Sequence, residues 1–210
     1  MHSANRKAFF GDLVFEVCEN VYEPAEDSFL FAETLYLKTG ARVLDMGTGS
    51  GILGVLAAKE ASEVVAVDVN PHAIHCAKQN ATRNSVHGKM AFLQGDLFTP
   101  LNNAAKFDLI LFNAPYLPSE QGEEESWLGR AWAGGIAGRQ VIDRFISQAP
   151  NHLKKEGEIL LMQSNLADVE ATHRAFEARG MNAAVVARED LPFFETLVLL
   201  TATFKKTSET

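Results

Sequence analysis

Three aspartates follow three successive apolar runs in the first half of the chain, and carboxylates so placed can bind a nucleoside. Asp45 precedes a glycine-rich turn, in VLDMGTGSG, where small residues let the backbone approach a ligand closely and where a carboxylate suits a cation. Asp68 is placed to accept hydrogen bonds from ribose hydroxyls, and Asp96 to accept one from an adenine amine. Together they predict a site for a purine nucleoside with a cationic end. The candidate residues are Asp45, Gly47, Gly49, Gly51, Asp68, Val69, Asp96 and Leu97.

Each of these signals has a simpler explanation when it is taken alone. A glycine-rich turn is a common structural device, and Asp68 before Asn70 and Pro71 is also typical of a helix start. Turn chemistry does not explain why every one of the three strand ends carries an aspartate. The combination therefore favours the nucleoside site.

A fourth apolar run ends in a polar and aromatic corner. Residues 109–112 are Leu-Ile-Leu-Phe, and Asn113, Ala114, Pro115 and Tyr116 follow directly. A proline-containing turn after a buried strand would account for this corner on its own. Beside the upstream glycine-rich motif, we interpret it as part of the same site.

The elements that must position these residues alternate between apolar runs and helical patterns. This alternation predicts an α/β fold with a mostly parallel sheet, helices on both faces and an antiparallel finish. We expect strands at residues 41–46, 64–69, 90–93, 107–112, 158–162, 183–187 and 195–202. We expect helices at residues 24–40, after Gly51, after Asn70, at 138–153 and at 165–179. Phe193 and Phe194, in the last connection, are predicted to be core residues.

Length, composition and charge restrict the function further. The 210 residues are 47% hydrophobic, and we expect one domain over 1–210, with an N-terminal extension and helix in 1–40 and a frayed tail at 205–210. The net charge of −8 disfavours a nucleic-acid substrate. Two cysteines are too few for a disulfide framework, no metal cluster is evident, and no apolar run is long enough to cross a membrane. A cytoplasmic protein without a membrane segment or a metal is expected.

Taken together, the motifs resemble those of class I S-adenosylmethionine-dependent methyltransferases over nearly the whole chain. The tetrapeptide resembles the Asn-Pro-Pro-Tyr motif of HemK-type protein glutamine methyltransferases and of enzymes that methylate exocyclic base amines. The resemblance implies a Rossmann-like seven-stranded sheet with one antiparallel strand, and S-adenosylmethionine as cofactor. Ala114 is a departure, because the family usually has proline there, but the backbone carbonyl is retained.

The resemblance also implies roles for the tetrapeptide. Asn113 Oδ1 and the Ala114 carbonyl would accept the hydrogens of a planar nitrogen and hold it in line with the methyl group. Pro115 would fix the direction of the Ala114 carbonyl, and Tyr116 would stack on the planar group. Asn113 would also border the cofactor.

Two further stretches are similar to the archaeal and eukaryotic branch of HemK-like enzymes, which methylates the glutamine of the Gly-Gly-Gln motif in class I release factors. They are VYEPAEDS at residues 21–28 and WAGGIAGR at residues 132–139. By this resemblance Ser28 would contact the methionine part of the cofactor. The entrance to the target pocket would be lined by Tyr22, Glu26 and Asp27. A structural role at a helix start accounts equally well for Tyr22 and Glu26.

The same branch works with a small zinc-binding activator that adds a strand to the sheet edge. Residues 89–94, Lys-Met-Ala-Phe-Leu-Gln, would form that edge, which is apolar and poorly protected. Packing under a neighbouring helix would explain Phe92 nearly as well.

Three alternative functions stay open on the sequence alone. The tetrapeptide permits an RNA or DNA amine methyltransferase, which the acidic charge disfavours. Ala114 and the exposed edge permit a cofactor-binding partner subunit without activity, and the same pocket permits lysine methylation. The long segment 117–136, with two tryptophans and the acidic run 123–125, is typical of a lid or a binding segment.

Overall fold

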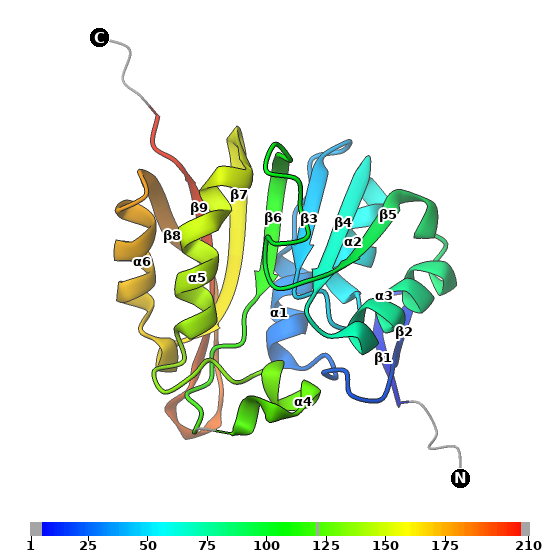
Figure 1. Cartoon of the computed structure of the whole chain (residues 1–210), viewed down its shortest axis with the longest axis horizontal. Coiled ribbons are helices and arrows are strands. Elements are labelled where there is room, and N and C mark those ends of the chain that lie inside the picture. The colour runs from blue at the N-terminus through cyan, green and yellow to red at the C-terminus, as the bar shows by residue number, and fades with distance from the viewer. Residues whose placement is uncertain (1–5, 121, 207–210) are drawn as a thin grey trace.

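The computed structural model describes residues 6–120 and 122–206, which are built around a twisted seven-stranded sheet with helices on both faces (Figure 1). The strand order is β5-β4-β3-β6-β7-β9-β8, and β9 is antiparallel to both of its neighbours. The strands are β3 Arg42–Met46, β4 Glu63–Asp68, β5 Met90–Gln94, β6 Phe107–Asn113, β7 Leu153–Ser164, β8 Met181–Asp190 and β9 Thr196–Phe204. The predicted α/β fold, mostly parallel with one antiparallel strand, is confirmed.

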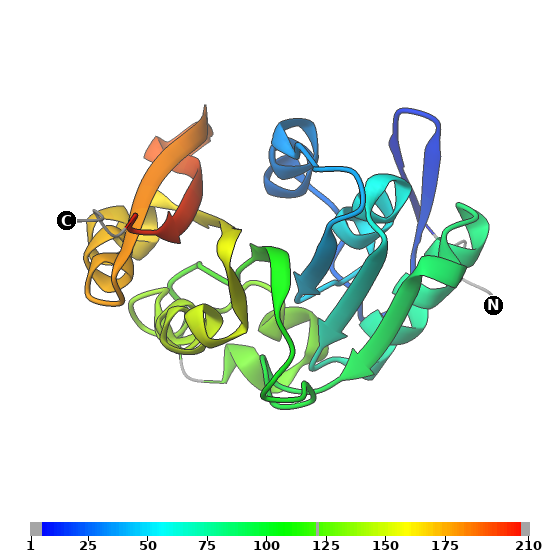
Figure 2. The same cartoon turned by 90° about the horizontal axis from the view of Figure 1, so that it is seen from above.

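Helices cover both faces of this sheet. Helices α1 and α2 lie on one face and α5 on the other (Figure 2), while α3 contacts α2 and α6 contacts α5. The α-helices are α1 Glu26–Thr34, α2 Ile52–Glu60, α3 Pro71–Arg83, α4 Trp127–Arg130, α5 Gln140–Gln148 and α6 Val169–Glu177. Single turns of 3₁₀ helix are η1 His87–Lys89, η2 Glu123–Glu125, η3 Ala149–His152, η4 Asn165–Ala167 and η5 Pro192–Phe194.

The middle residues of the central strands are mostly apolar because helices cover both sides of the sheet. Val43 and Leu44 of β3 and Ile110 and Leu111 of β6 have no exposed surface. Polar side chains in β3 and β6 lie toward both ends of these strands, and the carboxyl ends of the strands meet at one edge of the sheet.

Several predicted boundaries differ from the structure. The helix expected at 24–40 spans only Glu26–Thr34, because Leu35 adopts an extended conformation with ψ of 109°. The helices expected at 138–153 and 165–179 each divide into an α-helix and a 3₁₀ turn. Strand β7 is much longer than the predicted 158–162, since it pairs with β6 on one side and with β9 on the other.

An antiparallel hairpin at the N-terminus was not predicted. Strands β1 (Arg6–Phe10) and β2 (Leu13–Val17) are joined through Gly11, which has φ of 54°. The fully buried side chain of Asn80 on α3 donates to the Glu16 carbonyl (2.9 Å) and accepts from the Glu16 N–H (2.8 Å). The hairpin is therefore fixed to the main body of the fold.

The prediction that Phe193 and Phe194 are core residues is wrong. Both side chains are 96% exposed, on the turn η5 between β8 and β9. Of the predicted frayed tail, residues 207–210 lie outside the described residues. Among the described residues, no helix has the length and apolar character needed to span a bilayer.

Candidate active site

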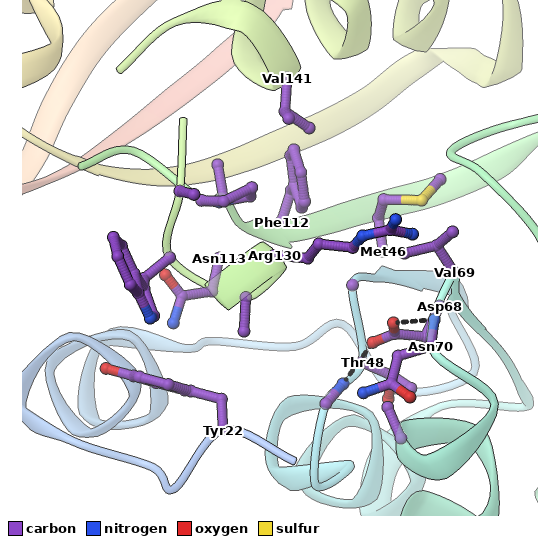
Figure 3. Close-up of a pocket in the computed structure, with 18 of the residues that line it drawn as sticks. Tyr22, Met46, Thr48, Asp68, Val69, Asn70, Phe112, Asn113, Arg130 and Val141 are labelled. Carbon is purple, nitrogen blue, oxygen red and sulfur yellow. Dashed lines mark hydrogen bonds between the residues drawn. The ribbon is translucent and has the colours of Figure 1, made fainter. Parts of the chain in front are cut away.

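A cavity of about 710 Å³ opens at the carboxyl edge of the parallel strands (Figure 3). Its wall is formed by the ends of β3, β4 and β6, the start of α1, and parts of the segment between β6 and α5. Ligand sites in open α/β sheets lie at this edge, and cavities of this size hold small organic ligands. This cavity is therefore the candidate site for the predicted chemistry.

The glycine-rich turn after β3 brings backbone close to the cavity. Gly47 has φ of 65°, and a Cβ added there would lie 3.2 Å from the Phe112 ring. Gly51, with φ of 87°, does not line the cavity; a Cβ there would lie 3.0 Å from Ala77 on α3. Gly51 therefore permits close packing of the turn against α3, and the cofactor role predicted for it stays a prediction.

Asp68 ends β4 with its carboxylate at the cavity wall. Its two oxygens accept from the backbone N–H groups of Gly49 and Asn70, each at 2.9 Å (Figure 3). Burial raises the pKa of Asp68, and these hydrogen bonds act against that rise. A carboxylate has about four acceptor sites, so Asp68 retains capacity for ribose hydroxyls. Val69, half exposed beside it, also lines the cavity.

Asp45 is buried behind the cavity wall, and the cofactor role predicted for it stays a prediction. Its side chain is 1% exposed, and Oδ2 accepts from the Thr48 hydroxyl (2.5 Å) and from the Gly54 N–H (2.9 Å). Burial raises the pKa of Asp45 to about 7. These two hydrogen bonds hold the glycine-rich turn onto the start of α2.

Asp96 and Leu97 follow β5 and both line the cavity. The Asp96 carboxylate accepts a hydrogen bond from Arg144 on α5, at 2.5 Å. Leu97 is buried with φ of 48°, a left-handed conformation that is unusual for a leucine. The adenine contact predicted for Asp96 stays a prediction, now with Arg144 as a neighbour.

Asn113, the last residue of β6, has an asymmetric hydrogen-bond environment. Its Nδ2 donates to Asp27 Oδ2 (3.0 Å) and to Ser28 Oγ (3.3 Å), both at the start of α1. Its Oδ1 is buried and has no hydrogen-bond partner among the described residues. A buried amide oxygen without a donor is costly, which indicates that a ligand group supplies the donor.

Asp27 is the centre of a small polar network around Asn113. It is 6% exposed and also accepts from the hydroxyls of Tyr22 (3.3 Å) and Tyr116 (3.5 Å). Burial, followed by the charge of Asp27, raises the pKa of both tyrosines, so both stay protonated hydrogen-bond donors. Residues from α1, from the loop before it and from the tetrapeptide thus meet at one point.

The other residues of the predicted target pocket are placed unequally. Ala114 and Pro115 line the cavity, and the Ala114 N–H donates to the Met162 carbonyl at 3.4 Å. Glu26 is exposed and does not line the cavity, and its predicted place at the entrance stays a prediction. As an acidic residue in the first turn of α1 it favours the helix start.

The long segment after β6 supplies cavity residues that the sequence did not assign. Trp127, Arg130 and Trp132 line the cavity, and the guanidinium of Arg130 lies 4.9 Å from the centre of the Trp127 ring. Figure 3 shows Arg130 reaching into the cavity. The two tryptophans are the sequence feature that could have identified this part of the cavity, since large aromatic residues in a long connection often belong to a binding segment.

Within the described ranges, 6–120 and 122–206, no three His, Cys, Asp or Glu side chains are grouped as metal ligands. His72 and His75 on α3 are exposed, as expected for surface residues.

Comparison with known proteins gives a consistent set of relatives. The family model of the ribosomal protein L11 methyltransferase, PrmA, matches residues 28–114. A Methanocaldococcus jannaschii protein, provisionally named a protein N5-glutamine methyltransferase, is 41% identical over 181 residues, covering 85% of this chain and 90% of the relative. Methyltransferase HEMK2 of Mus musculus is 33% identical over 175 residues, covering 77% of this chain and 80% of the relative.

One solved structure adds the same fold. A chain of the E. cuniculi Mtq2-Trm112 complex, described as responsible for methylation of the eRF1 translation termination factor, aligns with a TM-score of 0.70 and 24% identity. The alignment covers 89% of this chain and 99% of that chain. This likeness concerns the fold, whereas the two sequence relatives carry the family assignment.

Proposed function

Because the chain belongs to the HemK-like family of class I S-adenosylmethionine-dependent methyltransferases, and is a protein-glutamine methyltransferase, we propose that it methylates the Gly-Gly-Gln glutamine of a class I translation release factor. The observation that carries this proposal is the buried Asn113 Oδ1 without a donor. A primary amide supplies the planar N–H group that such an acceptor needs. The eRF1 methylation ascribed to the E. cuniculi complex supports the choice of substrate.

The residues around the cavity fit S-adenosylmethionine, the cofactor of the family. Asp68 has acceptor capacity for ribose hydroxyls, and Gly47 and Gly49 provide a close backbone approach. Ser28 also lines the cavity and accepts a hydrogen bond from Asn113. When bound, the cofactor supplies an electrophilic methyl group on a sulfonium.

Catalysis by this chain consists mainly of positioning. Asp27 and Ser28 accept hydrogen bonds from Asn113 Nδ2, so the Asn113 Oδ1 atom is left to accept a hydrogen bond from the substrate. Asn113 Oδ1 and the Ala114 carbonyl would accept the two hydrogens of the glutamine amide. Held in that way, the nitrogen would turn its lone pair out of conjugation and toward the methyl group, and it would release one N–H proton on the side of these acceptors as it gains the methyl group.

The tyrosines would hold the plane of the amide. Tyr116 is 9% exposed and lines the cavity beside Asn113, where its ring can stack on the glutamine side chain. Its hydroxyl is fixed by Asp27, as is that of Tyr22. Pro115 restrains the preceding backbone and with it the direction of the Ala114 carbonyl.

We further propose that a small zinc-binding activator pairs with the free edge of β5. Strand β5 is the terminal strand of the sheet, as the sequence predicted. Phe92 is half-buried and packs on the core, with its ring near His87, so its side chain serves ordinary packing while its backbone is available for pairing. The Trm112 subunit in the E. cuniculi complex supports a partner of this kind.

The test is methyl incorporation from labelled S-adenosylmethionine into a purified archaeal-type release factor, with and without the activator. We expect labelling of the wild-type factor and none of a version in which Gly-Gly-Gln is changed to Gly-Gly-Ala. Equal labelling of the two versions would refute the proposed target atom. Labelling of neither would refute the proposed substrate.

A further inference from the structure

Four exposed apolar side chains lie in connections at the carboxyl edge of the sheet, outside the cavity lining, and none of them takes part in the mechanism above. Three come from short turns and one from the glycine-rich loop before α5. We name this set the apolar rim: Ile136 (92% exposed), Leu166 (48%), Phe193 (96%) and Phe194 (96%).

The topology places the apolar rim beside the target pocket. Strand β9 begins next to the end of β7, where Leu197 pairs with Ser164, and β7 lies beside Asn113 of β6. Turn η5 therefore projects from the same edge of the sheet as the cavity. In Figure 1 the orange turn between β8 and β9 and the green helix α4 both lie at the lower edge.

Electrostatics and hydrogen bonds support this proximity. The pKa of Tyr116 is raised chiefly by burial, but the charge of Glu195, directly after Phe194, contributes. Arg139, at the end of the loop that carries Ile136, donates to the carbonyls of Ala167 and Asp168 beside Leu166. The loop, the turn η4 and the turn η5 thus form one continuous border.

The two phenylalanines are held exposed by a braced backbone. The Asn165 side chain donates to the Phe194 carbonyl (3.1 Å) and accepts from the Thr196 N–H (2.9 Å). Phe193 and Phe194 have φ of 63° and 65°, a left-handed conformation that is unfavourable for bulky residues. Such strain is found at functional sites, and here it presents two rings to solvent.

The charges around the rings define the chemistry of an occupant. Arg188, Glu189 and Asp190 precede the turn and are exposed, and Glu195 follows it, so acidic side chains predominate beside the rings. With a net charge of −8 for the chain, a second copy or an anionic surface would be repelled. Apolar side chains flanked by lysine or arginine would be complementary.

We propose that the apolar rim is the docking surface for the protein substrate, and that it binds apolar side chains with lysine or arginine beside them on the surface next to the acceptor glutamine. This inference rests on the proposed function. The rim lies outside the cavity, so it affects how the substrate protein binds and leaves the reacting amide to Asn113.

The test compares wild-type enzyme with the double variant Phe193→Ser/Phe194→Ser in steady-state methylation of the release factor. Two exposed aromatic anchors at an interface carry enough binding energy that KM for the factor should rise about tenfold or more, with kcat within about twofold. Affinity for S-adenosylmethionine, measured by calorimetry, should not change. A short Gly-Gly-Gln peptide, which cannot reach the rim, should react equally with both enzymes.

A matched control is Tyr36→Ser, since Tyr36 is 84% exposed but lies between α1 and β3, at the opposite end of the sheet. It should leave all constants unchanged. The charge component is tested by Glu189→Lys, which should raise KM for the factor and weaken its salt dependence.

The outcomes separate the two levels of inference. Labelling of the factor with the same KM in wild type and double variant would overturn the docking surface and leave the proposed function intact. No labelling by the wild type would overturn the proposed substrate, and the docking surface with it. A wild-type dimer in sedimentation that the double variant lacks would assign the rim to self-association and also overturn the docking surface.

Discussion

Asn113 combines a restrained amide nitrogen with an amide oxygen that has no donor among the described residues. Replacing Asn113 with alanine removes the acceptor but leaves Asp68 and the glycine-rich turn in place. We expect methyl transfer to fall by about 10²-fold or more, the usual cost of losing one group that stabilises a transition state. Cofactor affinity should stay near the wild-type value. Labelled-methyl kinetics and calorimetry check this, with Asn103→Ala, an exposed loop asparagine, as control.

Asp27 acts through Asn113, and a mutant cycle can show this. In Asp27→Asn the new side-chain amide can donate a hydrogen bond to Asn113 Oδ1. The Asn113 side-chain amide can then reverse, which turns Oδ1 away from the substrate. The turnover number should fall, and adding Asp27→Asn to Asn113→Ala should cause little further loss. Additive losses in the double variant would argue that Asp27 has a separate role.

Asp45 makes the stability of the fold depend on pH. Its folded pKa of about 7 lies above the ordinary value of 3.8, so the folded state binds more protons than the unfolded state between these values. The contribution of Asp45 to the free energy of unfolding should therefore be greatest below about pH 4. It should decline as the pH rises to 7, by at most about 1.4 kcal/mol per pH unit.

The variant Asp45→Asn tests this dependence. An asparagine oxygen can still accept from Thr48 and Gly54, and it does not ionise. Urea unfolding at several pH values should show a smaller decline between pH 4 and 7 than in wild type. Asp12→Asn, in the exposed turn of the hairpin, serves as control, and an undiminished decline in Asp45→Asn would contradict the assignment.

At the scale of the elements, the periodicity of the sequence predicted the parallel strands because they are buried on both faces and read as continuous apolar runs. The hairpin β1–β2 was missed although Gly11 and Asp12, between two five-residue strands, are a typical two-residue turn. It depends on Asn80, 64 positions from Glu16, and such a contact is not visible in local sequence.

The site residues, too, could be predicted where local sequence determines their place and were missed where distant contacts do. Strand ends placed Asp68, Asn113 and Tyr116 at the cavity, because the carboxyl edge is determined by topology. The burial of Asp45 was not predicted, because the direction of a side chain at a strand end depends on the donors of the next helix, here the Gly54 N–H. The exposure of Phe193 and Phe194 follows from strained backbone angles that residue type alone does not reveal.

The edge strand β5 gives a prediction about the activator. Gly95 N–H bonds the Asp68 carbonyl of β4, and Asp68 pairs with Gln94. In a parallel pair, the N–H and C=O of Gln94 must then face away from β4. Gln94→Pro therefore removes an outward donor while it keeps the pairing with β4, as is tolerated at sheet edges.

We expect Gln94→Pro to lose complex formation with the zinc-binding activator in sedimentation experiments and to keep its cofactor affinity. Gln94→Ala retains the backbone donor and should bind the activator like wild type. A Gln94→Pro variant that forms the complex with unchanged affinity would exclude strand addition at β5.

For the whole molecule, the charge distribution distinguishes a protein substrate from a nucleic acid. The net charge is −8, and acidic residues flank the apolar rim. A protein that binds nucleic acid neutralises phosphates and loses affinity steeply with salt. The logarithm of its binding constant falls with the logarithm of the salt concentration with a slope near −0.9 per phosphate contact for duplex DNA.

We therefore expect negligible retention of tRNA in filter binding even at about 50 mM salt, and no transfer of labelled methyl to total RNA. Binding of the release factor should weaken only mildly with salt, because a few ion pairs at the rim are involved. RNA labelling, or a steep salt slope for tRNA, would instead favour an exocyclic-amine substrate, which the Asn113 acceptor would serve by the same geometry.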